Sequence, residues 1–249
     1  MSVRIVYGKL RKGNAMRSDR TLRKHLPETY PYKPATVLKM IRKYSSVFIK
    51  PDKGSQGKGI IRIRRLSSDK VQISWGLRHR KVPSGKAVRT LSRLLRPNST
   101  YLIQQGLELE KYKNRKFDIR IFMQKPQSKW FISGRIVRVG APGRFVTNYS
   151  QGASPQTIEN VFNSIYKNRP NNTKQMIKKI DALCFALAKR MDRKFPGVRE
   201  LGIDIGVDKK SSIWIIEANT TPQFNSFKRL SDKTMYKRIL ARHRYIYRK

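Results

Sequence analysis

Two carboxylates and an amide stand inside two apolar, strand-like segments of the sequence. Asp204 lies in ELGIDIGV, and Glu217 and Asn219 lie two residues apart in SIWIIEAN. A hairpin of these segments would bring the three side chains together, because alternate residues of a strand share a face. Their oxygen atoms are hard ligands that suit Mg²⁺ or Mn²⁺ bridging the phosphates of a nucleotide. The alternative is a hairpin with outward polar residues, although a carboxylate in an apolar strand is costly without a partner.

A glycine-rich turn joins two other apolar segments in FIKPDKGSQGKGIIRIRR. It is not a Walker A loop, because Gly59 rather than Ser or Thr follows Lys58. It is not a dinucleotide loop either, because a strand rather than a helix follows the glycines. The glycines would let backbone N–H groups approach an anion closely, with the Lys50 ammonium beside them. A phosphate-binding loop and a plain basic hairpin both remain open.

Arginines stand in and after a third apolar segment, FDIRIFMQK. Arg120 lies within it, and Arg135 and Arg138 follow in the next strand-like segment. Arginines that project from strands into a cleft are good clamps for phosphate or carboxylate groups. A structural ion pair between Asp118 and an arginine is an equally good interpretation.

The charge balance is extreme, with 57 basic against 15 acidic residues and a formal net charge of +42. Such a charge predicts salt-dependent attraction to polyanions, whether nucleic acid, anionic membrane, acidic protein or polymer. A solubility or localisation role is the plainer alternative. No signal peptide and no membrane span is predicted, so we expect an intracellular, cytoplasmic protein. Cys184 is expected to be a buried thiol, and His25, His79 and His243 receive no catalytic role.

The order of the predicted elements indicates an α+β fold of antiparallel strand pairs with segregated helices rather than a doubly wound sheet. Helices are expected over 36–44, from about 158 to 165, and from an N-cap at Asn172 or Thr173 to about 191. Strands are expected at 46–50, 59–65, 71–77, 101–109, 117–125, 129–140, 200–207 and 212–219. The tail KRILARHRYIYRK reads as either a docked helix or a polyanion-binding arm.

Taken in order, these segments resemble the ATP-grasp superfamily, and more narrowly its YheC/YheD branch of endospore coat-associated proteins. The resemblance runs from about Lys9 to Pro222. It rests on HLPETY, FIKPDKGSQGKGI, LIQQGLEL, FDIRIFMQK, RVGAPGRFVTNYSQGA, LGIDIGVD and WIIEANTTPQF. Any one of these motifs is weak, whereas the seven in the family's order are specific.

The resemblance implies a nucleotide held between two α+β lobes. It predicts an N-terminal lobe at 1–105, a C-terminal lobe with the metal site at 106–230, and a basic tail at 231–249. The turn from Gly54 to Gly59 would be a mobile lid over the phosphates. The nucleotide contacts would be Lys9, Lys50, Gly54, Ser55, Gln56, Gly57, Gly59, Gln104, Gln105 and Leu107.

Within that set, Lys50 would contact the α- and β-phosphates, and the Gln104, Gln105 and Leu107 stretch would form the hinge that binds adenine. Lys12 is close enough to compete with Lys9 for the first lysine. Asp204, Glu217 and Asn219 match the family's Mg²⁺ ligands. Arg120, Arg138 and Asn148 fall where the family places residues facing the γ-phosphate or the acyl intermediate.

The activity implied is ATP- and Mg²⁺-dependent ligation of a carboxylate to an amine through an acyl phosphate. Few residues precede Lys9, so the usual N-terminal substrate domain is expected to be truncated, supplied by a partner or built differently. The charge fits an acidic protein, peptide or polymer as acceptor, with spore-coat proteins as candidate partners and the forespore or spore coat as a candidate location. The alternatives are a non-catalytic coat-associated protein and a non-specific nucleic-acid-binding protein.

Overall fold

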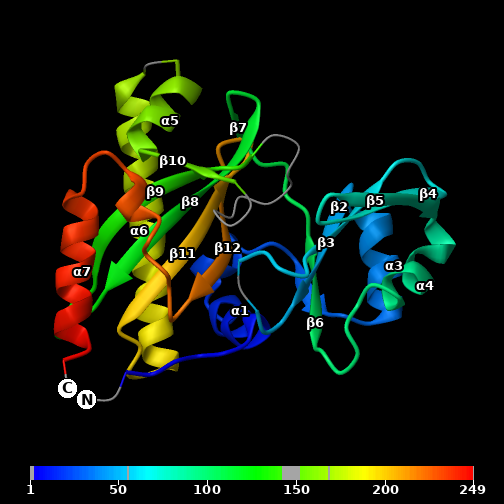
Figure 1. Ribbon diagram of the computed structural model, residues 1–249, viewed down its shortest axis with the longest axis horizontal. Helices are drawn as coiled ribbons and strands as arrows, with labels where there is room; N and C mark the ends of the chain where they lie inside the picture. Colours follow the sequence, from blue (N-terminus) through cyan, green and yellow to red (C-terminus); the bar gives the residue numbers. More distant parts are fainter. Residues whose placement is uncertain (1–2, 55, 142–151, 168, 249) are drawn as a thin grey trace. The chain divides into compact units, whose positions relative to one another are not determined.

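The computed structural model of the protein describes residues 3–54, 56–141, 152–167 and 169–248 (Figure 1). In this part of the chain, no helix is long and apolar enough to cross a membrane. Helices and antiparallel strand pairs make up the structure, which confirms the predicted α+β class.

Contacts between residues divide the chain into two compact units. Unit 1 comprises residues 1–7, 11–26 and 109–249, and unit 2 comprises residues 8–10 and 27–108. Each unit has a hydrophobic core of its own. The lobes expected from the sequence stay a prediction about functional domains. The division into compact units differs from the predicted division into lobes, because residues 11–26 group with the C-terminal part of the chain.

Unit 2 is built on a six-stranded sheet in the order β1-β6-β2-β3-β4-β5, in which every neighbouring pair is antiparallel. The strands are β1 (Thr29–Pro31), β2 (Ser46–Pro51), β3 (Ile61–Arg65), β4 (Lys70–Trp75), β5 (Arg78–Pro83) and β6 (Tyr101–Gln105). Apolar residues alternate along β2, β3 and β4, so one face of the sheet is buried.

Two helices cover that buried face of unit 2. The first, α3 (Pro34–Lys43), has proline at its first turn, where the missing N–H costs nothing. The second is α4 (Ala87–Ser92), which follows the 3₁₀ turn η1 (Ser84–Lys86). Leu91 of α4 and Val37 of α3 pack into one core with the inward residues of β2, β3 and β4.

Unit 1 contains a second antiparallel sheet, in the order β10-β9-β8-β11-β12, with β7 paired to β8. The strands are β7 (Lys111–Tyr112), β8 (Arg115–Gln124), β9 (Phe131–Val139), β10 (Ser154–Gln156), β11 (Glu200–Val207) and β12 (Ile213–Asn219). The helices α5 (Ile158–Ile165) and α6 (Pro170–Lys194) pack on one face. The N-terminal segment adds most of α1 (Lys9–Arg17) and the short α2 (Arg20–Arg23).

The opposite face of the unit 1 sheet is covered at one end by α7 (Thr234–Ile246) and the 3₁₀ turn η3 (Phe227–Arg229). Phe122 and Ile136 of the sheet form a small core there with Phe227 and Ile239. Gly134 permits this close approach, because a Cβ at that position would lie 2.6 Å from Phe227 Cε1. Most of the basic tail is therefore a docked helix, coloured red in Figure 1.

Candidate functional site

A β-bulge in β12 brings the predicted metal ligands together on one face of the unit 1 sheet. Asp204 pairs with Glu217, but the next residue of β11 pairs with Ile215, so Ile216 is the extra residue of a bulge. Without the bulge, Glu217 and Asn219 would continue the alternation of Ile213 and Ile215 into the core under α6. The bulge reverses that alternation and places both side chains on the face of Asp204.

The same face carries a buried network of two arginines and two aspartates. Arg120 Nε lies 2.6 Å from Asp204 Oδ1, and Arg120 Nη2 donates to Asp204 Oδ2 at 3.2 Å. Arg138 Nη2 lies 3.0 Å from Asp204 Oδ1. Arg138 also donates from Nε and Nη2 to the two carboxylate oxygens of Asp118 at 2.6 and 2.7 Å. The four side chains therefore form a continuous chain of ion pairs.

Burial makes this network electrostatically strong. The four residues are each at most 9% exposed. Burial alone would raise the pKa of Asp204, but attraction to Arg120 and Arg138 lowers it below its ordinary value. Burial alone would lower the pKa of Arg138, but Asp118 and Asp204 raise it. Asp204 is thus held ionised, and the arginines are held in fixed positions before any ligand binds.

Gly202 makes room for one of these arginines. A Cβ at this position would lie 2.4 Å from Arg120 Nη1 and 2.5 Å from Pro222 Cβ. A larger residue would therefore displace the guanidinium from Asp204. This is a reason for glycine in ELGIDIGV that the sequence alone did not reveal.

The donor set at this face fits a small divalent cation. Asp204, Glu217 and Asn219 offer two carboxylates and an amide oxygen, which are hard ligands. Asp204 Oδ1 is buried and meets no donor in hydrogen-bonding alignment among the described residues, although two guanidinium nitrogens lie close. A cation here would share the Asp204 carboxylate with the arginines. No group of three or more His, Cys, Asp or Glu residues among the described residues could hold a metal, and this face offers two carboxylates with an amide as the third donor.

The two candidate lysines of α1 lie at different places. Lys12 is buried in unit 1, and its Nζ donates to Asn219 Oδ1 at 3.3 Å. Lys9 belongs to unit 2, where its Nζ donates to the backbone oxygen of Gly54 at 2.8 Å. The family resemblance favoured Lys9 over Lys12 as the first lysine that contacts the nucleotide. The structure places Lys9 at the glycine turn and Lys12 beside a candidate metal ligand.

The glycine turn of unit 2 contains the positive backbone φ angles that its glycines suggested. Gly54, Gly57 and Gly59 have φ values of 140°, 70° and 72°, and Gln56 has 59°. Positive φ values of this kind favour glycine. Ser55 lies outside the described residues.

Lys50 and Gln104 lie on the face of the unit 2 sheet that α3 and α4 do not cover, whereas Gln105 pairs with Val47 and shares the covered face. Lys50 Nζ donates to Gln104 Oε1 at 2.5 Å, and Gln104 Nε2 donates to Thr29 Oγ1 at 3.1 Å. Gln105 Oε1 accepts from the backbone N–H of Glu28 at 3.1 Å. The Gln104 carboxamide therefore fixes the lysine ammonium. Leu107 is half-buried just after β6.

Asn148 lies outside the described residues, so its predicted role stays a prediction. The ion pair between Asp118 and an arginine, which the sequence offered as an alternative, is present with Arg138. Lys12 was considered only as a substitute for Lys9, and its hydrogen bond to Asn219 was not predicted. The sequence held no signal that separates the two lysines, because residues three apart on a helix lie on the same side of it.

Comparison with known proteins identifies relatives of the whole described fold. Residues 4–246 match the family described as YheC/D-like ATP-grasp. The endospore coat-associated protein YheD of Bacillus subtilis (strain 168) is 24% identical over 210 residues, covering 79% of this chain and 45% of that protein. YheC of the same strain is 25% identical over 245 residues, covering 87% of this chain and 63% of that protein. The chain thus spans only part of the length of these relatives.

Solved structures of ligase-type enzymes share the fold. N5-carboxyaminoimidazole synthase from Aspergillus clavatus, in complex with ADP and 5-aminoimidazole ribonucleotide, matches with a TM-score of 0.59 at 11% identity, over 98% of this chain and 52% of that chain. D-cycloserine synthetase DcsG matches with a TM-score of 0.55 at 13% identity, over 95% and 71%. The ATP-grasp ligase PsnB, complexed with a minimal precursor, matches with a TM-score of 0.53 at 16% identity, over 94% and 60%.

Proposed function

The chain belongs to the YheC/D-like ATP-grasp family, and from that premise we propose that it is an ATP- and Mg²⁺-dependent ligase that joins a carboxylate to an amine. The observation that carries the proposal is the array on the face of the unit 1 sheet opposite α6. Asp204, Glu217 and Asn219 stand there beside two preorganised arginines. Its relatives in the fold include an enzyme solved with ADP and an enzyme named a ligase.

In unit 1 we assign the metal to Asp204, Glu217 and Asn219. Mg²⁺ or Mn²⁺ bound there would act as a Lewis acid on phosphate oxygens and orient them. Arg120 and Arg138 would neutralise charge that develops on the γ-phosphoryl group and on the acyl phosphate. Lys12, hydrogen-bonded to Asn219, would hold that amide in position.

In unit 2 we assign the phosphate-facing role to Lys50 and the glycine turn, with Lys9 holding the turn through Gly54. Gln104, Gln105 and Leu107 would contact adenine, mainly through backbone groups. Nucleotide binding would then require Lys50 to exchange its contact with Gln104 for a phosphate oxygen, which is a stronger, charge-assisted acceptor.

The reaction needs no protein nucleophile. A substrate carboxylate oxygen attacks the γ-phosphorus of ATP, ADP leaves, and an acyl phosphate forms. An amine nitrogen then attacks the acyl carbon, phosphate leaves with the C–O bond electrons, and the ammonium proton is released to solvent. Positioning and charge neutralisation by the residues above supply the catalysis.

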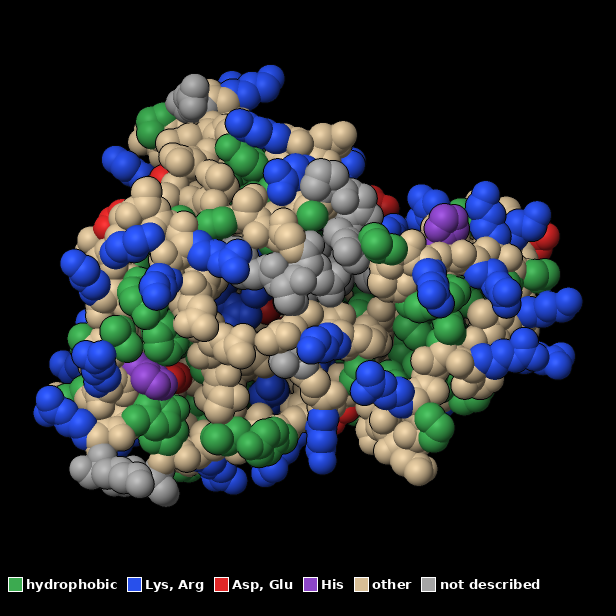
Figure 2. Space-filling model, in the orientation of Figure 1, with side chains coloured by type: hydrophobic (Ala, Val, Ile, Leu, Met, Phe, Trp, Pro, Cys, Tyr) green, Lys and Arg blue, Asp and Glu red, His purple; other side chains and the backbone are tan. Residues whose placement is uncertain are grey.

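We propose an acidic protein, peptide or polymer as the substrate, because a chain of net charge +42 attracts polyanions. Figure 2 supports this, since Lys and Arg side chains are spread over the visible face with few Asp or Glu between them. Association with the spore coat is a further proposal, which draws on the names of YheC and YheD.

Calorimetry at low salt tests the nucleotide and metal assignments first. We expect ATP to bind in the presence of Mg²⁺, and Glu217→Gln to weaken that binding at least about tenfold. Glu159→Gln, an exposed change of the same charge on α5, is the matched control and should leave it unchanged. Absence of Mg-ATP binding by the unaltered protein would sink the proposal.

Mass spectrometry of products, after incubation with Mg-ATP and cell extract, tests the ligation itself. We expect a new amide or similar bond that Glu217→Gln does not form, together with release of ADP. If the protein binds ATP but its release of ADP stays at background across a panel of acidic acceptors, a non-catalytic coat-associated protein would be favoured. A steep salt dependence of DNA binding that ATP does not affect would favour a nucleic-acid-binding protein.

A further inference from the structure

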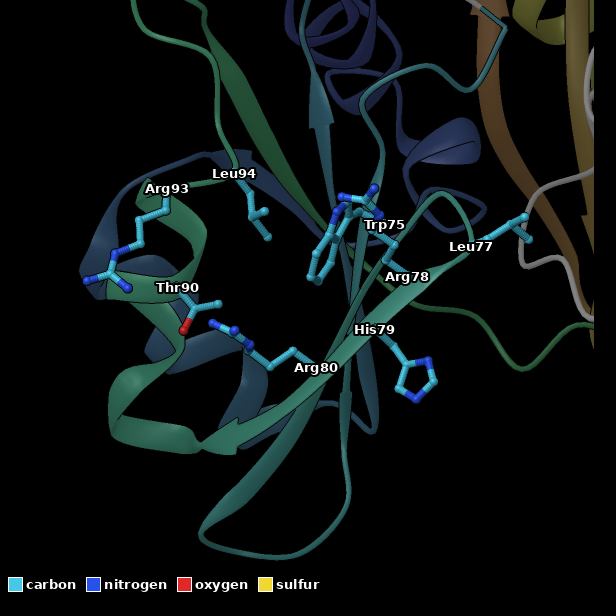
Figure 3. Close-up of a pocket in the computed structure, with 8 residues that line it drawn as sticks. All are labelled: Trp75, Leu77, Arg78, His79, Arg80, Thr90, Arg93 and Leu94. Atoms are coloured by element: carbon cyan, nitrogen blue, oxygen red, sulfur yellow. The ribbon is translucent and has the colours of Figure 1, made fainter.

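A groove of about 520 Å³ opens at the outer edge of unit 2, and no step proposed above uses it (Figure 3). It lies where the turn between β4 and β5 passes the end of α4. The residues that line it are Trp75, Leu77, Arg78, His79, Arg80, Thr90, Arg93 and Leu94. Lys50 and Gln104 belong to the opposite face of the same sheet, as the alternation of β2 and β6 shows.

The groove exists because α4 is too short to cover the end of the sheet. Arg80 pairs with Ile73 on β4, and Arg78 pairs with Trp75, so both arginines lie on the face that is buried farther along. Val82 shares that face and is only 9% exposed, because the six-residue helix α4 covers it. Beyond the helix, positions that elsewhere carry core residues carry exposed arginines. Figure 3 shows Arg80 extending toward Thr90 of α4, whereas His79 points away.

The arginines of the groove have no acidic counterpart. Within the described part of the chain, the side chains of Arg78, Arg80 and Arg93 make no ion pair or hydrogen bond. The acidic residues of unit 2 are engaged elsewhere: Glu28 with Lys43, Asp52 with the N–H of Leu10, Asp69 with Ser67, and Glu108 with Ser45. The positive charge of the groove is therefore available to a partner.

The groove also runs beside an open backbone edge. Among the described strands β5 pairs only with β4, so its outer N–H and C=O groups are not used by the sheet. An extended peptide can add to such an edge, and its alternate side chains then point to one face. Alternate residues of a strand stand about 7 Å apart, which matches Arg78 and Arg80 two positions apart.

We propose that this groove binds an acidic peptide segment in extended conformation, added as a strand along β5. Carboxylates at alternate positions of the peptide contact Arg78 and Arg80 in the bidentate geometry that guanidinium favours. An apolar side chain of the peptide packs against Trp75 and Leu94, which are half-buried in the groove wall. A single-stranded nucleic acid fits less well, because it needs successive aromatic platforms and cannot use a sheet edge.

Fluorescence anisotropy with a labelled peptide that carries Glu, Glu and Leu at alternate positions, with Ser between them, tests the proposal on the full chain at about 0.15 M salt. We expect Arg78→Gln/Arg80→Gln to weaken binding by about tenfold or more, since hydrogen bonds to two guanidinium groups are lost. Lys33→Gln/Lys39→Gln removes equal charge from the exposed N-cap and surface of α3 and is the matched control. Equal weakening by both variants would overturn the proposal, because non-specific attraction would then explain the binding.

Two further probes separate the parts of the proposal. A peptide with the same side chains and N-methylated backbone amides should bind at least about tenfold more weakly, and equal binding would overturn strand addition along β5. A single-stranded RNA that competes fully with the peptide and loses its own affinity in Arg78→Gln/Arg80→Gln would overturn the choice of a peptide. Mg-ATP affinity should be unchanged in this variant, so loss of peptide binding is distinguishable from failure of the proposed ligase function.

Discussion

Removing the charge of Asp204 should strongly destabilise unit 1. Asp204→Asn keeps the shape of the side chain but leaves Arg120 without its carboxylate and Arg138 with only Asp118. Breaking a buried ion pair from one side costs about 3–5 kcal/mol. Because Arg138 keeps one partner, we expect about 3 kcal/mol in the free energy of unfolding. For a protein of this size that corresponds to a fall of about 6–12 °C in Tm.

Tryptophan emission can isolate this effect to the affected unit. Trp130 and Trp214 belong to unit 1 and Trp75 to unit 2, so urea unfolding of a Trp75→Phe protein reports unit 1 alone. Glu159→Gln in the same background is the control and should change the unfolding free energy by no more than about 0.5 kcal/mol. A loss below about 1 kcal/mol for Asp204→Asn would refute the network as a desolvated, mutually dependent set of charges.

A double variant tests the same ion pair by removing both of its charges together. Asp204→Leu together with Arg120→Met removes both charges, and apolar replacement of a buried pair is often neutral or stabilising. We therefore expect the double variant to be more stable than Asp204→Leu alone. If the losses of the two single variants simply added, the coupling between Arg120 and Asp204 would be disproved.

Two further predictions concern unit 2. Hydrogen bonds from Lys43 and Tyr44 lower the pKa of Glu28 to about 2 from 4.5, so its contribution to stability is present above pH 4.5 and lost as the pH falls toward 2. Because Lys43 is half-exposed, that contribution is about 1 kcal/mol, and Glu28→Gln should flatten the acid decline in denaturant midpoint followed by circular dichroism. Gly106→Ala would place a Cβ 2.1 Å from Ser46 Oγ and 2.7 Å from Ser46 O, so we expect a loss of about 2 kcal/mol in urea unfolding. Ser46→Ala should restore only part of that loss because the backbone oxygen remains, and a failure to restore any of it would contradict the clash with Ser46 Oγ.

The strands of both sheets were predictable wherever one face is buried. β2, β3, β8 and β11 show regular alternation or dense apolar content, because one side of each packs against helices. Their antiparallel arrangement with segregated helices followed from the order of the segments. The predicted α+β class and the family resemblance were confirmed for this reason.

Elements without an apolar stripe were not predictable. β5 has only Val82 buried, because α4 leaves the rest of the strand uncovered, and its residues looked like a basic run. α1 is similar, since in KLRKGNAMR the buried positions include Lys12. The long helix α6 was predicted but begins at Pro170, before the expected N-cap, because proline suits the first helical turn.

The candidate site was predictable as a set of residue types but not as a geometry. Strict alternation from Ile213 and Ile215 would have buried Glu217 and Asn219 under α6. The consecutive apolar residues Ile215 and Ile216 were the available signal of a bulge, although such a pair also occurs in regular strands. Whether the three oxygen donors bind a metal stays a prediction.

Arginines of two classes contribute to the net charge of this chain. Acidic residues are scarce, at 15 against 57 basic ones, and two of them are spent on holding Arg120 and Arg138 inside unit 1. Arg78 and Arg80 stand instead on a core-facing side of a sheet with no acid assigned to them. The proposed peptide would bring carboxylates to these arginines, and the comparison with Lys33→Gln/Lys39→Gln separates that proposal from a role in solubility.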